Sequence, residues 1–241
     1  MGDLTYNHRV FYYWTPLTRG SRYFESGCMK FLVLTDIHGN EDVSSWANKL
    51  VKEKGADFVV ILGDITQFGP KSWAENFLST FEVPVCAVAG NCDPPAEIMD
   101  AINKKSLLLH KRKIFIEDVP FIGLGGSNPT IFDTPFELSE DEIESSLEPL
   151  MENNAVLVLH APPMGTNDTI PSGAHVGSSA IKAIVDMYHP RLVLSGHIHE
   201  ARGMVEENKT IFINPGPAMS GYSAMITING DETEVEMLEL K

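Results

Sequence analysis

Short apolar runs alternate with longer polar stretches along most of the chain. Each of the strongest runs is about five residues long, which is the length of a strand that is buried on both faces. These runs occupy positions 31–35, 58–62, 85–89, 155–159 and 192–195. Weaker stretches predict further strands at 113–117, 121–124, 210–214, 224–229 and 233–238. The strand-rich C-terminal end favours mixed or antiparallel pairing there.

The stretches between several of these runs have the polar and apolar spacing of helices. They predict helices at 41–54, 71–80, 94–104, 139–153 and 178–188. Ser178 stands at the start of the last one and is a suitable N-cap, because its hydroxyl can accept a hydrogen bond from a free backbone N–H. Strands that alternate with helices indicate an α/β fold built in layers.

The first 28 residues differ in character from the rest. Three arginines against two acidic residues give this stretch a charge of +1, so residues 29–241 carry −16. We divide the chain into an aromatic N-terminal extension, 1–28, and a domain, 29–241. Either Met29 is the true first residue, or the extension is a native arm that packs on its own domain or on a second subunit. Its aromatic residues are Tyr6, Phe11, Tyr12, Tyr13, Trp14, Tyr23 and Phe24.

The overall charge excludes several classes of partner. The 241 residues include 18 Lys and Arg against 33 Asp and Glu, which gives a formal charge of −15. Proteins that coat duplex DNA or an anionic membrane need Lys and Arg to displace counterions, so we expect neither partner. A small phosphorylated substrate stays compatible with the sequence, because a local metal site can outweigh the global charge.

Cysteine content and hydropathy favour a cytoplasmic protein. Cys28, Cys86 and Cys92 are too few, and odd in number, for a disulfide framework, which favours a reducing compartment. No apolar run approaches the roughly 20 residues that span a bilayer. The N-terminus also lacks the basic segment and following apolar segment of a signal peptide.

Polar side chains follow the five strong apolar runs at their carboxyl ends. In open α/β sheets this edge is where ligands bind, and neighbouring glycines let the chain turn sharply there. The segments are DIHGN, GD, GNCD, a lone histidine and GHIH, in chain order. Their polar residues are Asp36, His38, Asp64, Asn91, His160, His197 and His199.

Carboxylate, imidazole and amide groups of this kind bind hard or borderline metal ions. Seven ligands exceed the needs of one ion, whereas two ions about 3.5–4 Å apart, bridged by a carboxylate, would use them all. Each segment alone is more often an ordinary turn or a structural histidine, and GHIH is the most specific of them. Their occurrence in order, each after an apolar strand, favours a metal site over coincidence.

In this order the motifs resemble those of the calcineurin-like metallophosphoesterase superfamily, from about Met29 to about Asn214. The strings HAPPMGT, HVGS, GHIHEARG and NPGP are similar to an archaeal and bacterial predicted phosphoesterase branch of it. The resemblance implies a two-sheet β-sandwich flanked by helices, in four layers, with Asp64 as a bridge between two metals. It implies that the first metal is held by Asp36, His38, Asp64 and His199, and the second by Asp64, Asn91, His160 and His197.

The activity that the resemblance implies is hydrolysis of phosphate esters by a metal-activated water. Asp64, Asn91 and His160 are then the residues expected to act in catalysis. The lack of a Ser–His or Cys–His nucleophile pattern agrees with this. The cofactors would be two divalent ions from among Mn, Fe, Ni, Zn and Co, and the ligand types do not choose between them.

Cys92 departs from the family pattern. Many members have a histidine at this position of G-N-x-[DE], where it contacts the substrate phosphate and helps to protonate the leaving group. A thiol, with an ordinary pKa of about 8.5, is a weak donor, so we expect phosphodiesters to be better substrates than phosphomonoesters. The alternative role for Cys92 is a small filler beside the site. His175, in a long Gly- and Pro-rich loop after His160, is a second candidate substrate contact.

Several questions stay open from the sequence. Asp93 either orients a ligand histidine or caps the next helix, and Asp168 is expected to be a solvated turn residue. The rival function is a non-catalytic protein-interaction scaffold, with the retromer scaffold subunit of this fold as precedent, although the full ligand set favours the enzyme. A nuclease is disfavoured by the negative charge. The sequence does not identify the natural substrate or the oligomeric state, and a homo-oligomer is compatible with it.

Overall fold

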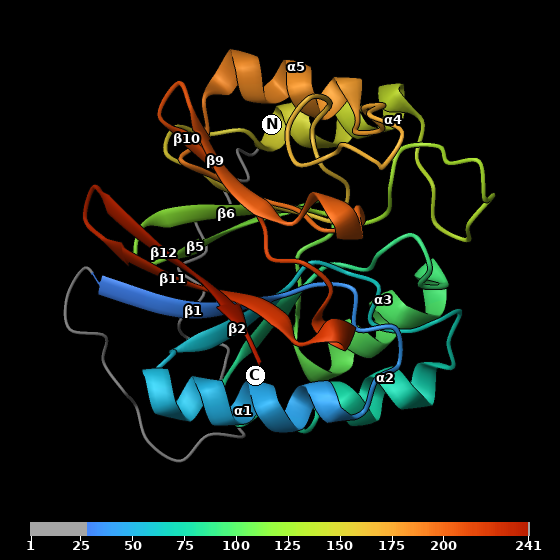
Figure 1. The fold of residues 1–241 in the computed structure, drawn as a ribbon, viewed down its shortest axis with the longest axis vertical. Helices are drawn as coiled ribbons and strands as arrows, with labels where there is room; N and C mark the ends of the chain where they lie inside the picture. The colour runs from blue at the N-terminus through green and yellow to red at the C-terminus, as the bar shows by residue number, and fades with distance from the viewer. Residues whose placement is uncertain (1–27, 241) are drawn as a thin grey trace, which may run out of the picture.

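In the structure, a computed structural model that describes residues 28–240, two six-stranded sheets lie face to face with helices on both outer sides (Figure 1). The predicted α/β sandwich in four layers is therefore confirmed. The predicted extension, 1–28, lies outside the described residues apart from Cys28, so its role stays a prediction.

The first sheet combines strands from both ends of the chain, in the order β12–β11–β1–β2–β3–β4. Strands β1 to β4 run parallel, and β11 is antiparallel to both of its neighbours, as the C-terminal pattern predicted. The strands are β1 (Cys28–Leu34), β2 (Phe58–Ile61), β3 (Val85–Ala87), β4 (Leu107–Leu108), β11 (Tyr222–Asn229) and β12 (Glu232–Glu239). The helices on its outer side are α1 (Asp42–Lys54), α2 (Lys71–Leu78) and α3 (Pro95–Lys105) (Figure 1).

The second sheet has the order β5–β6–β7–β8–β10–β9, with a parallel centre and one antiparallel strand at each edge. Its strands are β5 (Arg112–Ile116), β6 (Val119–Leu124), β7 (Val156–Leu159), β8 (Leu192–Leu194), β9 (Gly203–Glu207) and β10 (Thr210–Asn214). Helices α4 (Glu140–Leu147) and α5 (Ser179–Tyr188) cover its outer side (Figure 1). Among the helices of residues 28–240, none is long and apolar enough to cross a membrane.

The central strands are apolar throughout because each sheet is covered on both faces. In β1, Phe31 packs into the interior between the sheets, whereas Leu32 packs toward the helices. Phe31 stacks on Phe58 with ring centroids 4.9 Å apart, and it meets Phe121 of the second sheet edge-on at 5.7 Å. The edge-on contact of Phe31 with Phe121 joins the two sheets in the interior.

Most predicted elements are present, and the exceptions have local causes. The helix predicted at 139–153 ends at Leu147, because Pro149 lacks the N–H that would continue it. Strands β4 and β9 were missed, since one is two residues long and the other is a largely exposed edge strand. Ser178 is the N-cap of α5, as predicted, and its hydroxyl accepts from the Ile181 N–H at 3.1 Å.

Candidate metal centre

The carboxyl ends of five strands bring the predicted ligand residues to one edge of the sandwich. Three of these strands belong to the first sheet and two to the second, so the cluster lies where the two sheets meet. Asp36 and His38 follow β1, Asp64 follows β2, Asn91 follows β3, His160 follows β7, and His197 and His199 follow β8.

Asp36 uses its two carboxylate oxygens differently. Its Oδ2 accepts hydrogen bonds from the Thr35 hydroxyl at 2.8 Å and from the His197 backbone N–H at 3.1 Å. Its Oδ1 is buried and has no hydrogen-bond partner among the described residues, although it lies 3.3 Å from His199 Nε2 and 3.8 Å from His38 Nε2. Buried carboxylate oxygens are normally paired, so an unpaired one beside two imidazole nitrogens fits a bound cation.

Asp64 lies between two groups of ligands. Its Oδ2 is 3.6 Å from His38 Nε2, and its Oδ1 is 3.5 Å from His160 Nε2. The Cys92 backbone N–H donates to Oδ1 at 2.8 Å and fixes the orientation of the carboxylate. One buried carboxylate therefore presents one oxygen to each group.

His160 is held in a single tautomer. Its Nδ1 lies 2.8 Å from the Leu62 carbonyl oxygen, which can only accept, so Nδ1 carries the proton and Nε2 presents a lone pair. That lone pair faces Asn91 Oδ1 at 2.7 Å, while the Asn91 amide group donates to Thr134 Oγ1 at 3.1 Å. Lone pairs of His160, Asn91 and Asp64 thus converge with no proton between them, an arrangement that a metal ion would satisfy.

The histidines differ in their charge. Burial lowers the pKa of His160 to about 3, and it also lowers the pKa of His38 and of His197. These three imidazoles are neutral near pH 7 and can act as metal ligands. His199 is the exception, because the Asp36 carboxylate beside it raises its pKa.

The two carboxylates are shifted in opposite directions. Burial raises the pKa of Asp36, but the His199 and His160 imidazoles outweigh burial and leave that pKa below its ordinary value. Burial, together with the negative charges of Asp36 and Asp93, raises the pKa of Asp64. A cation shared by these carboxylates would relieve their mutual repulsion.

Four of the predicted ligand residues adopt a left-handed backbone conformation. The φ angles are 53° for Asp36, 47° for His38, 47° for Asp64 and 66° for His197. Such conformations cost non-glycine residues about 1–2 kcal/mol, and they cluster at functional sites. A side chain at Gly90 would overlap the Asp64 carboxylate, so glycine is required where the two loops approach.

Asp93 ties together the loops that follow β2 and β3. Its buried carboxylate accepts from the backbone N–H of Ile65 at 3.0 Å, of Thr66 at 2.8 Å and of Gly90 at 2.9 Å, and from the Thr66 hydroxyl at 2.8 Å. None of these partners is a histidine, and the N-cap of α3 is Pro94. Both predicted roles of Asp93 were wrong, because backbone donors from two loops occupy its carboxylate.

Cys92, one of the two predicted substrate contacts, is half-buried inside the cluster. Its sulfur lies within 4.8 Å of ligand atoms of His38 and Asp64. Burial and the neighbouring Asp64 charge raise the pKa of the thiol, so it stays protonated.

His175, the other predicted substrate contact, lies in the loop after β7. Its side chain is 52% exposed, and its Nδ1 is 2.7 Å from Asp168 Oδ1. Asp168 is fully buried and accepts from the N–H groups of Gly165 and Gly177, so the expectation of a solvated turn residue was wrong. The carboxylate satisfies loop N–H groups that would otherwise lack partners.

Two supporting residues were missed from the sequence. Thr35 orients Asp36, and its position directly before Asp36 was a usable signal. Thr134 orients Asn91 from 43 positions further along the chain, and only the fold reveals that contact.

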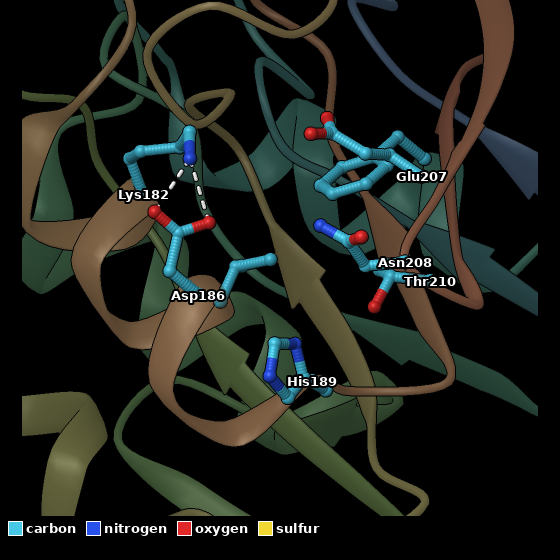
Figure 2. A pocket seen from close by; sticks show the side chains of 8 residues that line it. Lys182, Asp186, His189, Glu207, Asn208 and Thr210 are labelled. Atoms are coloured by element: carbon cyan, nitrogen blue, oxygen red, sulfur yellow. Dashed lines mark hydrogen bonds and ion pairs between the residues drawn. The ribbon is translucent and has the colours of Figure 1, made fainter.

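A small pocket at the opposite edge of the second sheet is separate from this centre (Figure 2). It lies between α5 and the turn from β9 to β10, where β8 and β10 begin. Lys182 Nζ contacts both carboxylate oxygens of Asp186, at 2.6 and 2.5 Å, so these charges satisfy each other. Its lining residues are Lys182, Val185, Asp186, His189, Glu207, Asn208, Thr210 and Phe212, none of which is a predicted site residue.

Comparisons with known proteins agree with the geometry. Residues 29–201 match the family model described as calcineurin-like phosphoesterase. The protein MJ1162 of Methanocaldococcus jannaschii is 37% identical over 201 residues, which cover 78% of this chain and 88% of that protein. A Synechococcus protein named as a probable cyclic nucleotide phosphodiesterase is 27% identical over 158 residues, which cover 63% of this chain and 61% of that protein. The crystal structure of TT1561 of Thermus thermophilus has a TM-score of 0.69 at 16% identity, covers 87% of this chain and 98% of its own, and shows the same fold.

Proposed function

The chain belongs to the calcineurin-like phosphoesterase family, and we propose that it is a dinuclear metal-dependent enzyme that hydrolyses phosphodiesters in preference to phosphomonoesters. The observation that carries the proposal is the Asp64 carboxylate, which presents Oδ2 to His38 and Oδ1 to His160. A carboxylate with a separate oxygen for each of two ligand groups suits a bridge between two ions.

The donor set fits two divalent ions. Oxygen and imidazole nitrogen donors suit Mn, Fe, Ni, Zn or Co, and the buried, unpaired Asp36 Oδ1 would gain a partner. One ion would be held by Asp36, His38, Asp64 and His199, and the other by Asp64, Asn91, His160 and His197.

When bound, the two ions would activate a water molecule for attack on phosphorus and neutralise charge on the phosphoryl oxygens. The chain's own residues prepare the ligands for this. The Leu62 carbonyl keeps the proton of His160 on Nδ1, so that Nε2 stays free. Thr35 and Thr134 orient Asp36 and Asn91 in the same way. Mutation of a residue that supports a metal ligand in this way typically lowers metal affinity or activity by about 10- to 100-fold.

Cys92 supports the preference for diesters. Its neutral thiol is a weak hydrogen-bond donor at the position from which a leaving group would be protonated. A diester with a good leaving group needs little proton assistance, and an alkyl monoester needs much. The similarity to a probable cyclic nucleotide phosphodiesterase, at 27% identity, points in the same direction.

The test is metal content and turnover of Asp64→Asn after reconstitution with each candidate metal. We expect two ions per chain in the wild type, fewer in the variant, and at least about 100-fold slower hydrolysis of bis(p-nitrophenyl) phosphate, since one metal contributes several kcal/mol of transition-state stabilisation. Asp118→Asn, the same change in the exposed β5–β6 turn, is the matched control and should behave as the wild type. Two ions and full turnover in Asp64→Asn would remove the bridging role. A folded wild type that never holds two ions would favour the scaffold.

A further inference from the structure

The loops around the metal centre expose large apolar side chains. Of the exposed large apolar residues in the described part of the chain, five of nine lie in the connections that follow strands at this edge. Ile131 is 93% exposed and Phe132 is 77% exposed, at the tip of the loop between β6 and α4. The other three are Phe68, Met164 and Met219.

Two of these residues join the ligand turns through backbone hydrogen bonds. The Phe68 N–H donates to the Cys92 carbonyl at 3.1 Å, and the Met219 N–H donates to the Asp36 carbonyl at 3.2 Å. Phe68 is itself 56% exposed and has a φ of 62°, a strained conformation for an aromatic residue. The backbones of these two exposed apolar residues are therefore tied directly to the turns that carry Asp36 and Cys92.

The tip with Ile131 and Phe132 is fixed in place. Glu137 Oε1 accepts from the hydroxyls of Thr130 and Thr134, both at 2.6 Å, so that the two ends of the tip are held together. Thr134 Oγ1 accepts in turn from the Asn91 amide at 3.1 Å. A loop that is ordered in this way, and that holds two apolar side chains in water, gains nothing in stability from them. They present apolar surface that is open to a ligand.

The same loops carry almost no positive charge. The segments 36–41, 63–70, 88–94, 125–138, 160–178, 195–202 and 214–221 contain no lysine and a single arginine. That residue, Arg202, lies 4.5 Å over the Tyr222 ring and donates to the carbonyl oxygens of Pro215 and Leu238. Substrates with several anionic groups, such as polyphosphates or nucleic acid strands, are normally held by Lys and Arg side chains. Apart from Arg202 and the histidines of these loops, only the metal ions would offer positive charge here.

We infer, on the basis of the proposed function, that the site takes a substrate with one phosphate group esterified to an apolar group, either aryl or long-chain alkyl. The phosphate group is held at the metal centre, and the apolar group lies against Phe68 and the tip formed by Ile131 and Phe132. Hydrolysis adds one water across a P–O ester bond of the diester and gives a monoester and an alcohol. The apolar rim lowers the free energy of the bound ester by removing part of its hydrocarbon from water.

The experiment uses p-nitrophenyl phosphates with a methyl, propyl or hexyl group as the second ester, so that the leaving group is constant. If each methylene of the alkyl group is half-buried against the apolar rim, it contributes about half of the roughly 0.8 kcal/mol of a buried CH₂. In the metal-loaded wild type, kcat/KM should therefore rise about twofold for each CH₂ that is added. The double variant Ile131→Ser and Phe132→Ser, and the variant Phe68→Asn, should flatten this increase. Met187→Ser removes a comparably exposed apolar side chain from α5, at 66% exposure, and should keep the wild-type increase. A carboxylate at the end of the hexyl chain should cancel the gain.

The outcomes separate this inference from the proposed function. Hydrolysis of the methyl ester without any increase along the series would overturn the inference and leave the phosphodiesterase proposal standing. No hydrolysis of any ester by a protein that holds two metals would refute the proposed function, and the inference with it. A third outcome combines two results: the wild type sediments with phosphatidylcholine vesicles and the Ile131→Ser/Phe132→Ser variant does not, while both proteins show the same kcat/KM values along the ester series. That outcome would assign the tip to membrane binding and overturn the inference.

Discussion

Asp93→Asn is the most informative single change near the centre, because the carboxylate of Asp93 joins two ligand loops. One oxygen accepts from the N–H groups of Ile65 and Gly90, and the other accepts from the N–H and the hydroxyl of Thr66. An asparagine keeps only one acceptor oxygen. Its best orientation directs that oxygen to Ile65 and Gly90 and turns the NH₂ group toward Thr66.

The cost follows from what Thr66 can do. Its hydroxyl can rotate and accept from the new NH₂ group, but its backbone N–H cannot, so one buried donor loses its partner. An unsatisfied buried N–H costs about 1–3 kcal/mol. Part of this is offset because burial raises the pKa of Asp93, which means that its charge is itself unfavourable there. We therefore expect Asp93→Asn to lower the free energy of unfolding by about 1–2 kcal/mol, and Asp93→Ala, which leaves three N–H groups without an acceptor, to lower it more.

The assay is urea unfolding with EDTA present, followed by metal titration of the refolded protein. Metal affinity should weaken by about 10- to 100-fold in Asp93→Asn, because both loops that it holds lead to ligand residues. Asp100→Asn is the matched control on the exposed side of α3, where Asp100 pairs with Lys71 and Lys104, and it should leave both measurements near the wild type. Wild-type unfolding free energies for both Asp93 variants would refute the reasoning.

The remaining predictions concern Cys92 and Glu137. Cys92→His should make the hydrolysis rate depend less steeply on leaving-group pKa, since general acid assistance is worth about 10²–10⁴ in rate. The measurement is the rate for a series of aryl methyl phosphates with leaving groups of graded pKa. Equal slopes for the wild type and the variant, at equal metal content, would exclude position 92 from leaving-group protonation. Burial raises the pKa of Glu137, but hydrogen bonds from Thr130 and Thr134 lower it to about 2 from an ordinary 4.5. A depressed pKa contributes stability that is present above the ordinary value and is lost as pH falls toward the folded-state value. Between about pH 5 and about pH 3, in EDTA, the wild type should thus lose more unfolding free energy than Glu137→Gln, and equal losses would contradict this assignment.

The strand ends were predictable because two independent patterns coincide there. Apolar runs locate the buried strands, and the parallel arrangement of those strands brings the residues after them to one edge. Asp36 and Asp64 could be placed together on this basis, although they are 28 positions apart and neither is distinctive alone. The resemblance to a known family then implied that the strands form two sheets packed as a sandwich.

The supporting residues could not be found in this way. Asp93 and Asp168 are acidic residues in turns, where the usual expectation is a cap or a solvated side chain. Their actual partners are backbone N–H groups of folded loops, and every residue except proline has such a group, so the sequence gives no sign of them. The contact of Thr134 with Asn91 depends likewise on how a long loop returns to the centre.

The energetics of the centre favour a bound metal ion over an unoccupied surface. His38 and His197 adopt left-handed conformations that cost about 1–2 kcal/mol each. Asp36 and Asp64 add mutual repulsion, and the buried Asp36 Oδ1 lacks a partner among the described residues. A chain that needed only this surface could relax all of these positions and become more stable. An ion that binds the folded form alone offsets such costs by mass action, by about 2.7 kcal/mol at 100 times its Kd. The strained, converging side chains therefore favour a cation bound at this edge of the sandwich.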